Sequence, residues 1–358
     1  MSNKPRASVL IPSYNHAAYI GDAIESILGQ SLTDFELIIV DDGSTDNSWD
    51  IIENYARSDS RIVAIRQENQ GPAAAGNRAL RLAKGDFIAF HTSDDRSGST
   101  RLEKQVCFLN AHAEYDAVGS FIDEIDERGQ IKSTGAYASW FNVPADVNDP
   151  GSWVWRNIVA SPTLMLRCGF FERYGIFDRD LVYTQDWDIL IRTLSRGGKL
   201  TILPEKLFQY RSHGNNLTHK NPIQTFWEYA YISSKTLHPW LMSSGNEGLV
   251  LRNITGFLHH EVFAQLDHNE RAALASVLLH NFDGTFQDLI LSLNDSRESH
   301  QIEAKTLEAY GQVQLELNQL WAERERVLMS RSWRLTRPLR FFARLMRKPS
   351  SRLTSVHG

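Results

Sequence analysis

The stretch FIAFHTSDDR, Phe87 to Arg96, decides the predicted fold because an apolar run ends abruptly in two adjacent aspartates. The run FIAF is typical of a buried strand, and Asp94 and Asp95 follow at its end. Adjacent like charges repel unless a cation or polar groups hold them. A buried strand that delivers two carboxylates to a sheet edge indicates an α/β protein with a ligand at that edge.

The residues before this stretch repeat the same pattern. Runs typical of buried strands alternate with segments of helical spacing, joined by short connections. The strands are expected at 7–15, 35–46, 61–67 and 86–90, and the helices at 17–31, 47–58 and 71–85. Such alternation predicts a mostly parallel central sheet with helices on both faces, in which ligands bind beyond the carboxyl ends of the strands.

Polar side chains cluster where three of these strands end, in PSYN, VDDGSTD and HTSDD. Turns are polar in general and aspartates often cap helices, which alone accounts for any single cluster. Three clusters together predict one crevice lined by Tyr14, Asp42, Asp94 and Asp95. Paired acids favour a divalent cation that shares its oxygen ligands with substrate phosphates, and a nucleoside diphosphate supplies such phosphates.

Composition and motifs exclude several other classes of protein. The 358 residues are 42% hydrophobic and 23% charged, which is typical of a soluble globular protein. Cys107 and Cys168 lack CxxC spacing, and neither a signal peptide nor a membrane-spanning run is evident, so a cytoplasmic protein is expected. GPAAAGNR lacks the Lys and Ser/Thr of a phosphate-binding loop, no GxGxxG follows the first strand, and the acidic body argues against nucleic acid.

The C-terminal part of the sequence is mainly helical in pattern and ends in a basic segment. Residues 222–295 have mainly helical patterns, and residues 299–330 carry a weak 3–4 repeat that predicts a long helix or short coiled coil through which the chain could form a homo-oligomer. Residues 331–358 contain seven Arg, one Lys and no acid. Such a basic amphipathic tail suits a helix on an anionic membrane surface; the alternative is a solvated helix that packs on the acidic body.

Five blocks resemble the family 2 glycosyltransferases: SVLIPSYN, LIIVDDGSTD, NQGPAAAGNRAL, KGDFIAFHTSDD and YTQDWDILIR, in the order of that family. The resemblance implies an inverting, GT-A (Rossmann-like) enzyme of the bacterial cell-surface polysaccharide type. The expected organisation is a GT-A domain at 1–217, a helical extension at 218–298, the long helix at 299–330 and the basic tail at 331–358.

The family's functional residues map onto individual positions of this sequence. The resemblance implies Asp186 as catalytic base, Asp95 and His213 as ligands of Mg²⁺ or Mn²⁺, and a nucleotide-sugar site formed by Pro12, Tyr14, Asp42, Asp94 and Arg211. The sequence departs from the family pattern at three places: Gly76 where Arg is frequent, Gln185 for the usual Glu, and Thr92-Ser93 where a further Asp is common.

The chemistry of sugar transfer explains these residue types. A divalent ion neutralises the charge of the leaving diphosphate, and a carboxylate within hydrogen-bonding reach activates the acceptor hydroxyl. Asp186 is the expected base and Asp188 its rival; on a helix the two point about 200° apart, so only one faces the crevice. Asp186 could instead cap that helix.

The predicted function is therefore transfer of a sugar from a UDP- or dTDP-linked donor to a glycan or lipid-linked acceptor, at the inner face of the cell membrane. The alternatives are a sugar nucleotidyltransferase and a membrane-associated scaffold with a relic site. The first normally carries a basic, glycine-rich loop after the first strand, which PSYNHAAYIGD lacks. The sequence names neither the sugar nor the acceptor.

Overall fold

The structure is a computed structural model, and it describes residues 4–280 except 155, 215, 218 and 219. The predictions for 299–330 and 331–358 lie outside the described residues, and the predicted domain boundaries stay predictions. No helix in the described part of the chain is both long and apolar enough to cross a membrane.

The N-terminal quarter has the predicted alternation of strands and helices. The elements are β1 (Ala7–Ser13), α1 (Ile20–Leu28), β2 (Phe35–Asp41), α2 (Ser48–Ser58), β3 (Ile62–Arg66), α3 (Pro72–Leu82) and β4 (Phe87–Phe90). β1 pairs in parallel with β2 and β4, and β2 pairs in parallel with β3. All four strands therefore end at the same edge of the sheet, as the sequence predicts.

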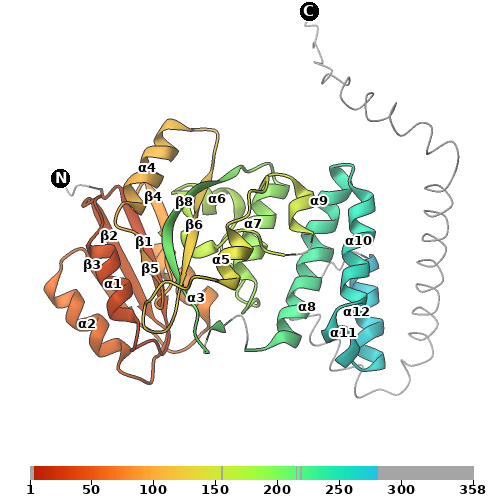
Figure 1. Cartoon of the computed structure of the whole chain (residues 1–358), viewed down its shortest axis with the longest axis horizontal. Helices are drawn as coiled ribbons and strands as arrows, with labels where there is room; N and C mark the ends of the chain where they lie inside the picture. The colour runs from red at the N-terminus through yellow and green to blue at the C-terminus, as the bar shows by residue number, and fades with distance from the viewer. Residues whose placement is uncertain (1–3, 155, 215, 218–219, 281–358) are drawn as a thin grey trace, which may run out of the picture. The chain divides into compact units, whose positions relative to one another are not determined.

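Later strands extend the sheet to eight, in the order β3-β2-β1-β4-β7-β6-β8-β5. The added strands are β5 (Arg96–Ser97), β6 (Ala117–Ile125), β7 (Met165–Arg167) and β8 (Leu200–Arg211). β7 runs antiparallel to β4 and β6, β5 runs antiparallel to β8, and β6 pairs in parallel with β8. The result is a mixed, mostly parallel sheet covered by helices, in agreement with the predicted GT-A architecture (Figure 1).

The core lies on both faces of this sheet because successive residues of a strand point to opposite sides. In β2, Leu37 and Ile39 pack in one apolar cluster, and Ile38 and Val40 in the other. Every residue of β2 is buried, which is the physical reason for the apolar run at 37–40 within this strand.

Helices fill the remainder of the described chain. α4 (Arg101–Ala111), α5 (Ala136–Phe141), α6 (Phe170–Tyr174) and α7 (Gln185–Ser195) lie between strands, with 3₁₀ turns at Pro150–Trp153 and Ser161–Thr163. After β8 come α8 (Pro222–Ile232), a π-helical turn (Ser233–Leu237), α9 (His238–Ser243), α10 (Glu247–Leu258), α11 (Glu261–Gln265) and α12 (His268–His280). Trp187 of α7 and Trp227 of α8 belong to the same buried cluster, so the predicted helical extension shares a core with the sheet domain.

Candidate active site

Three potential metal ligands converge beyond the strand ends, and we call His16, Asp94 and His213 the strand-end cluster. His213 Nε2 lies 3.0 Å from Asp94 Oδ2, and His16 Nε2 lies 3.8 Å from the same oxygen. One ligand atom from each residue falls within 4.8 Å of the other two. Because the residues follow β1, β4 and β8, the fold and not local sequence brings them together.

Neighbouring groups orient both histidines of the cluster. His16 Nδ1 and Ser93 Oγ are 2.6 Å apart, which leaves Nε2 directed at Asp94. The ring of Tyr19 stacks on His213 at a centroid separation of 4.9 Å. Burial lowers the pKa of His16 although the charge of Asp94 opposes the shift, so its imidazole is neutral at pH 7. Neutral imidazole is the form that binds a metal ion.

The two adjacent aspartates have opposite electrostatic surroundings. Burial disfavours the charged form of Asp94, but the hydrogen bond to His213 and the nearby His16 outweigh it and lower the pKa of Asp94. Burial and the charge of Asp94 raise the pKa of Asp95 well above its ordinary value. The two aspartates thus differ: the surroundings favour the charged form of Asp94 and disfavour that of Asp95.

Asp95 faces the protein and not the cluster. Its Oδ1 accepts a 2.6 Å hydrogen bond from the backbone N–H of Arg211, and its Oδ2 accepts one from the Thr92 hydroxyl. The role of Asp95 as metal ligand stays a prediction, and the arrangement favours Asp94 for that role.

Arg211 is almost completely buried, with 1% of its surface exposed. Its Nε donates to the backbone oxygen of Asp94 at 2.6 Å and its Nη2 to the carboxylate of Asp22 at 2.9 Å, while Nη1 donates to the carbonyls of Asp126 and Glu127. A contact between Arg211 and a donor phosphate stays a prediction. In this structure the guanidinium fixes the turn that carries Asp94.

The predicted nucleotide-binding residues lie around the ends of β1 and β2. Tyr14 is 43% exposed and its hydroxyl has no hydrogen-bond partner among the described residues, so its ring is accessible to a ligand. Pro12 is half-buried within β1. Asp42 is buried and accepts hydrogen bonds from Gln67 Nε2 at 2.7 Å and from the backbone N–H of Gly71 at 2.8 Å. Asp42 therefore also shapes the loop before α3.

Asp186 lies in the first turn of α7. Its Oδ2 accepts hydrogen bonds from Ser161 Oγ at 2.7 Å and Asn157 Nδ2 at 3.1 Å. Burial raises its pKa, although the bond from Ser161 opposes the shift. A raised pKa makes the carboxylate a stronger base.

Asp188, the rival base, is neutralised by a neighbour. Its Oδ2 lies 2.6 Å from Arg192 Nη2, one helical turn along α7, and the carboxylate is buried. An acid engaged in a buried ion pair is poorly suited to abstract a proton. The choice between the two acids therefore favours Asp186.

Glu228 of α8 positions the start of α7, a feature that the sequence prediction missed. This fully buried carboxylate accepts hydrogen bonds from the backbone N–H groups of Val182, Tyr183 and Thr184 at 3.0, 2.8 and 2.9 Å, and from the Thr184 hydroxyl at 2.9 Å. A single acid within the apolar run FWEYAYI was the available signal.

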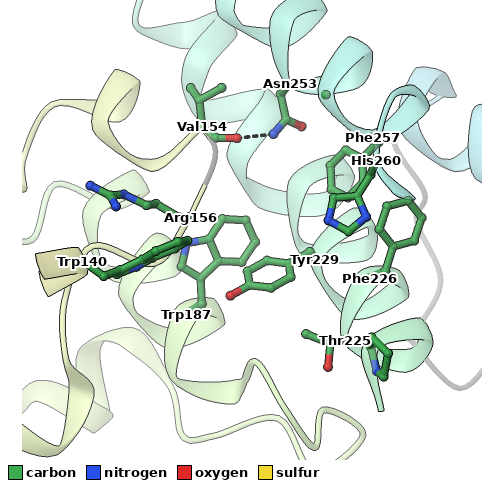
Figure 2. Close-up of a pocket in the computed structure, with 12 residues that line it drawn as sticks. Trp140, Val154, Arg156, Trp187, Thr225, Phe226, Tyr229, Asn253, Phe257 and His260 are labelled. Carbon is green, nitrogen blue, oxygen red and sulfur yellow. Dashed lines mark hydrogen bonds between the residues drawn. The ribbon is translucent and has the colours of Figure 1, made fainter. Parts of the chain in front are cut away.

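A hollow with a volume of about 300 Å³ is lined in part by Trp187, the residue after Asp186. We call it the aromatic pocket; its walls include Trp140, Arg156, Trp187, Phe226, Tyr229 and Phe257. Figure 2 shows Trp187 and Tyr229 between Trp140 and Arg156 on one side and Phe226 and Phe257 on the other. The sequence indicates tryptophans in this region but does not distinguish a pocket wall from a core.

Comparison with known proteins identifies the family. A model of "Glycosyl transferase family 2" matches residues 8–175. A putative glycosyltransferase of Bacillus subtilis, EpsE, is 34% identical over 215 residues, which cover 59% of this chain and 74% of EpsE. The chain belongs to glycosyltransferase family 2. It is accordingly a glycosyltransferase, and the predicted family is confirmed.

Two further relatives are also similar in sequence to this chain. An Escherichia coli enzyme, UDP-Glc:alpha-D-GlcNAc-diphosphoundecaprenol beta-1,3-glucosyltransferase WfaP, is 30% identical over 59% of this chain and 79% of its own length. The putative teichuronic acid biosynthesis glycosyltransferase TuaG of Bacillus subtilis is 48% identical over 30% of this chain, which spans only 42% of TuaG.

Solved structures share the fold. The TarS 1–349 fragment of S. aureus in complex with UDP has a TM-score of 0.59 and 18% identity, covering 88% of this chain and 91% of the fragment. The mannosyltransferase PcManGT of Pyrobaculum calidifontis, in complex with GDP-Man and Mn²⁺, has a TM-score of 0.54 and 18% identity. The match covers 90% of this chain and 88% of PcManGT. At such identities the likeness shows the fold alone.

Proposed function

We propose that this glycosyltransferase moves a sugar from a UDP- or dTDP-linked donor to a glycan or lipid-linked acceptor, with a divalent cation and with inversion at the anomeric carbon. The proposal is carried by the strand-end cluster together with Asp186, whose carboxylate is held by hydrogen bonds and forms no ion pair with a described residue, while Asp188 is held by Arg192. The UDP complex of TarS and the UDP-glucose donor in the name of WfaP support a UDP-sugar.

The strand-end cluster fits a divalent cation by its donor chemistry. Two imidazole nitrogens and one carboxylate oxygen favour Mn²⁺ over Mg²⁺, because Mg²⁺ strongly prefers oxygen ligands. We propose His16, Asp94 and His213 as the ligands, with Asp95 supporting the turn beneath them. The ion, when bound, neutralises the charge of the departing diphosphate. The Mn²⁺ complex of PcManGT supports this choice of ion.

Asp186 acts as the general base in this proposal. Ser161 and Asn157 hold one of its oxygens, and the N–H of Trp187 holds the other at 2.7 Å. A carboxylate fixed in this way accepts the proton of the acceptor hydroxyl as that hydroxyl attacks the anomeric carbon and the bond to the diphosphate breaks. One displacement with one base inverts the configuration.

The remaining predicted residues bind the donor in this proposal. The exposed ring of Tyr14 stacks on the base, and Asp42 and Pro12 form the adjoining wall. Arg211 acts through the turn of Asp94. The basic tail at 331–358 attaches the enzyme to the inner face of the membrane, and the helix at 299–330 provides a contact for a homo-oligomer; both lie outside the described residues.

A panel of nucleotide sugars tests this function through thermal stabilisation. With Mn²⁺ present, a UDP- or dTDP-sugar at about 100 times its Kd should stabilise the chain by about 2.7 kcal/mol. The same ligand without Mn²⁺, or with Asp94→Asn, should stabilise it much less. If no nucleotide sugar shifts the melting temperature under any of these conditions, the proposal is wrong.

A further inference from the structure

The aromatic pocket contains polar groups that no other part of the described protein satisfies. The Nε1–H of Trp187 is buried without a hydrogen-bond partner among the described residues, although Trp187 is only 2% exposed. The hydroxyl of Tyr229 likewise has no hydrogen bond within the described part of the chain. A hydroxyl without a partner in the wall of a pocket is available to a ligand that forms hydrogen bonds, and Tyr229 offers such a group, whereas the Nε1–H of Trp187 is buried beneath the wall.

Arg156 adds a positive charge at the edge of the same pocket. Its guanidinium carbon lies 4.6 Å from the centre of the Trp140 ring, and no acidic side chain pairs with it among the residues described. Trp140 itself is 44% exposed. The pocket thus combines an accessible aromatic face with a cation that no acidic side chain of the described part of the chain neutralises, which favours an anionic ligand.

Hydrogen bonds connect this pocket to the proposed base. Trp140 Nε1 donates to the backbone oxygen of Asn157 at 2.8 Å, and Asn157 Nδ2 donates to Asp186 at 3.1 Å. Trp187 follows Asp186 in α7 and packs edge-on against Tyr229, with ring centres 4.8 Å apart. Asp186 is thus linked through Asn157 and Trp187 to the wall of the pocket, although it does not itself line the pocket.

We propose that the aromatic pocket binds the acceptor, and that this acceptor is a saccharide carrying a phosphate or diphosphate group. The apolar face of its sugar packs on the aromatic walls, the hydroxyl of Tyr229 bonds one of its hydroxyls, and Arg156 binds its phosphate. The volume of about 300 Å³ matches a small-molecule site. This inference rests on the proposed function, because it assigns the second substrate of the same reaction.

Binding of sugar phosphates to the full chain tests the acceptor proposal. In the presence of saturating UDP and Mn²⁺, glucose 1-phosphate or N-acetylglucosamine 1-phosphate should bind at least about fivefold more tightly than the matching methyl glycoside, as measured by ligand-observed NMR. Arg156→Gln should remove this preference, and Trp140→Ala should weaken both probes. Arg81→Gln, on the exposed surface of α3, is the matched control and should behave as wild type.

Three outcomes would overturn the acceptor proposal: no binding of any probe, equal binding of phosphates and methyl glycosides, or an unchanged preference in Arg156→Gln. Donor binding and donor hydrolysis are measured in the same samples to separate the two proposals. If both persist while the probes fail to bind, only the acceptor proposal is wrong. If neither is found in wild type, the proposed function is wrong as well.

Discussion

The strand-end cluster and the aromatic pocket are built in different ways. His16 and Asp94 follow strands that end at one edge of the sheet. In the sequence, a cluster of polar residues marks the end of each of these strands. The aromatic pocket is formed by α5, α7, α8, α10 and the segment that carries Val154 and Arg156, and large apolar residues of α7 and α8 also fill the core. The first arrangement follows from topology, whereas the second depends on how helices distant in sequence pack.

This difference predicts a separation of function. Changes at the strand ends should alter binding of the donor and metal ion, changes in the pocket should alter binding of the acceptor, and changes at Asp186 and its support should alter turnover. Each of the following variants would break that separation if it produced the opposite pattern.

The largest effect is expected from Asp186→Asn. Transfer should fall by about 10³-fold because the amide cannot accept the proton, while donor Kd stays near wild type because the amide oxygen still accepts from Ser161. The melting temperature should fall only modestly, because the new NH₂ group faces the single N–H of Trp187. Steady-state kinetics and calorimetry measure the two effects. Asp188→Asn is the control: it loses a buried ion pair and should lower stability more than kcat. Equal losses of kcat in both variants would refute the choice of base.

Activity should also depend on pH through Asp186. Burial raises its pKa, so the fraction of the active carboxylate decreases as the pH falls through this raised value. kcat should therefore fall on the acid side at a higher pH than an exposed aspartate would give. A pH–rate profile with no such acid limb would contradict the assignment.

At the strand ends, Asp94→Asn should weaken Mn²⁺ binding in the presence of UDP by about 100-fold, because the cluster loses its only carboxylate. Asp95→Asn should keep most of that affinity, since its oxygens bond Thr92 and Arg211. Calorimetry with both variants tests the assignment. Loss of affinity in Asp95→Asn alone would restore Asp95 as the ligand.

Glu228→Gln should reduce kcat by about tenfold with little change in donor Kd, because displacement of the start of α7 misplaces Asp186. The amide presents a donor to backbone N–H groups, so the free energy of unfolding should also fall by about 1–3 kcal/mol. Transfer kinetics and denaturant unfolding measure these effects. A rise in donor Kd without loss of kcat would contradict the positioning role.

The smallest effect is expected from Tyr14→Ala. Loss of base stacking costs about 1–2 kcal/mol, which is roughly a tenfold increase in donor Kd. Tyr14→Phe keeps the ring and should bind donor as wild type does, since the hydroxyl has no partner among the described residues. Competition binding with UDP measures both variants, and equal affinities of Tyr14→Ala and wild type would remove the ring from the site.

The sequence predicts the first four strands and three helices well because β2 and its neighbours are continuous apolar runs bounded by turns. The sequence also indicates Asp94, because this residue lies only a few positions after the end of β4. It does not reveal that His16 joins Asp94, or that Glu228 holds Thr184 across 44 positions, because those contacts arise from tertiary packing. The sequence also does not show whether Trp187 belongs to the core or to the wall of a pocket, because a buried tryptophan is expected in both places.

The central claim is a single displacement with one base, and the configuration of the first product tests it most directly. The enzyme is supplied with an α-linked UDP-sugar and Mn²⁺, and the sugar released to water is followed by NMR before mutarotation. The account predicts that the β anomer appears first, and that Asp186→Asn abolishes its formation. Initial release of the α anomer would contradict the single-base mechanism.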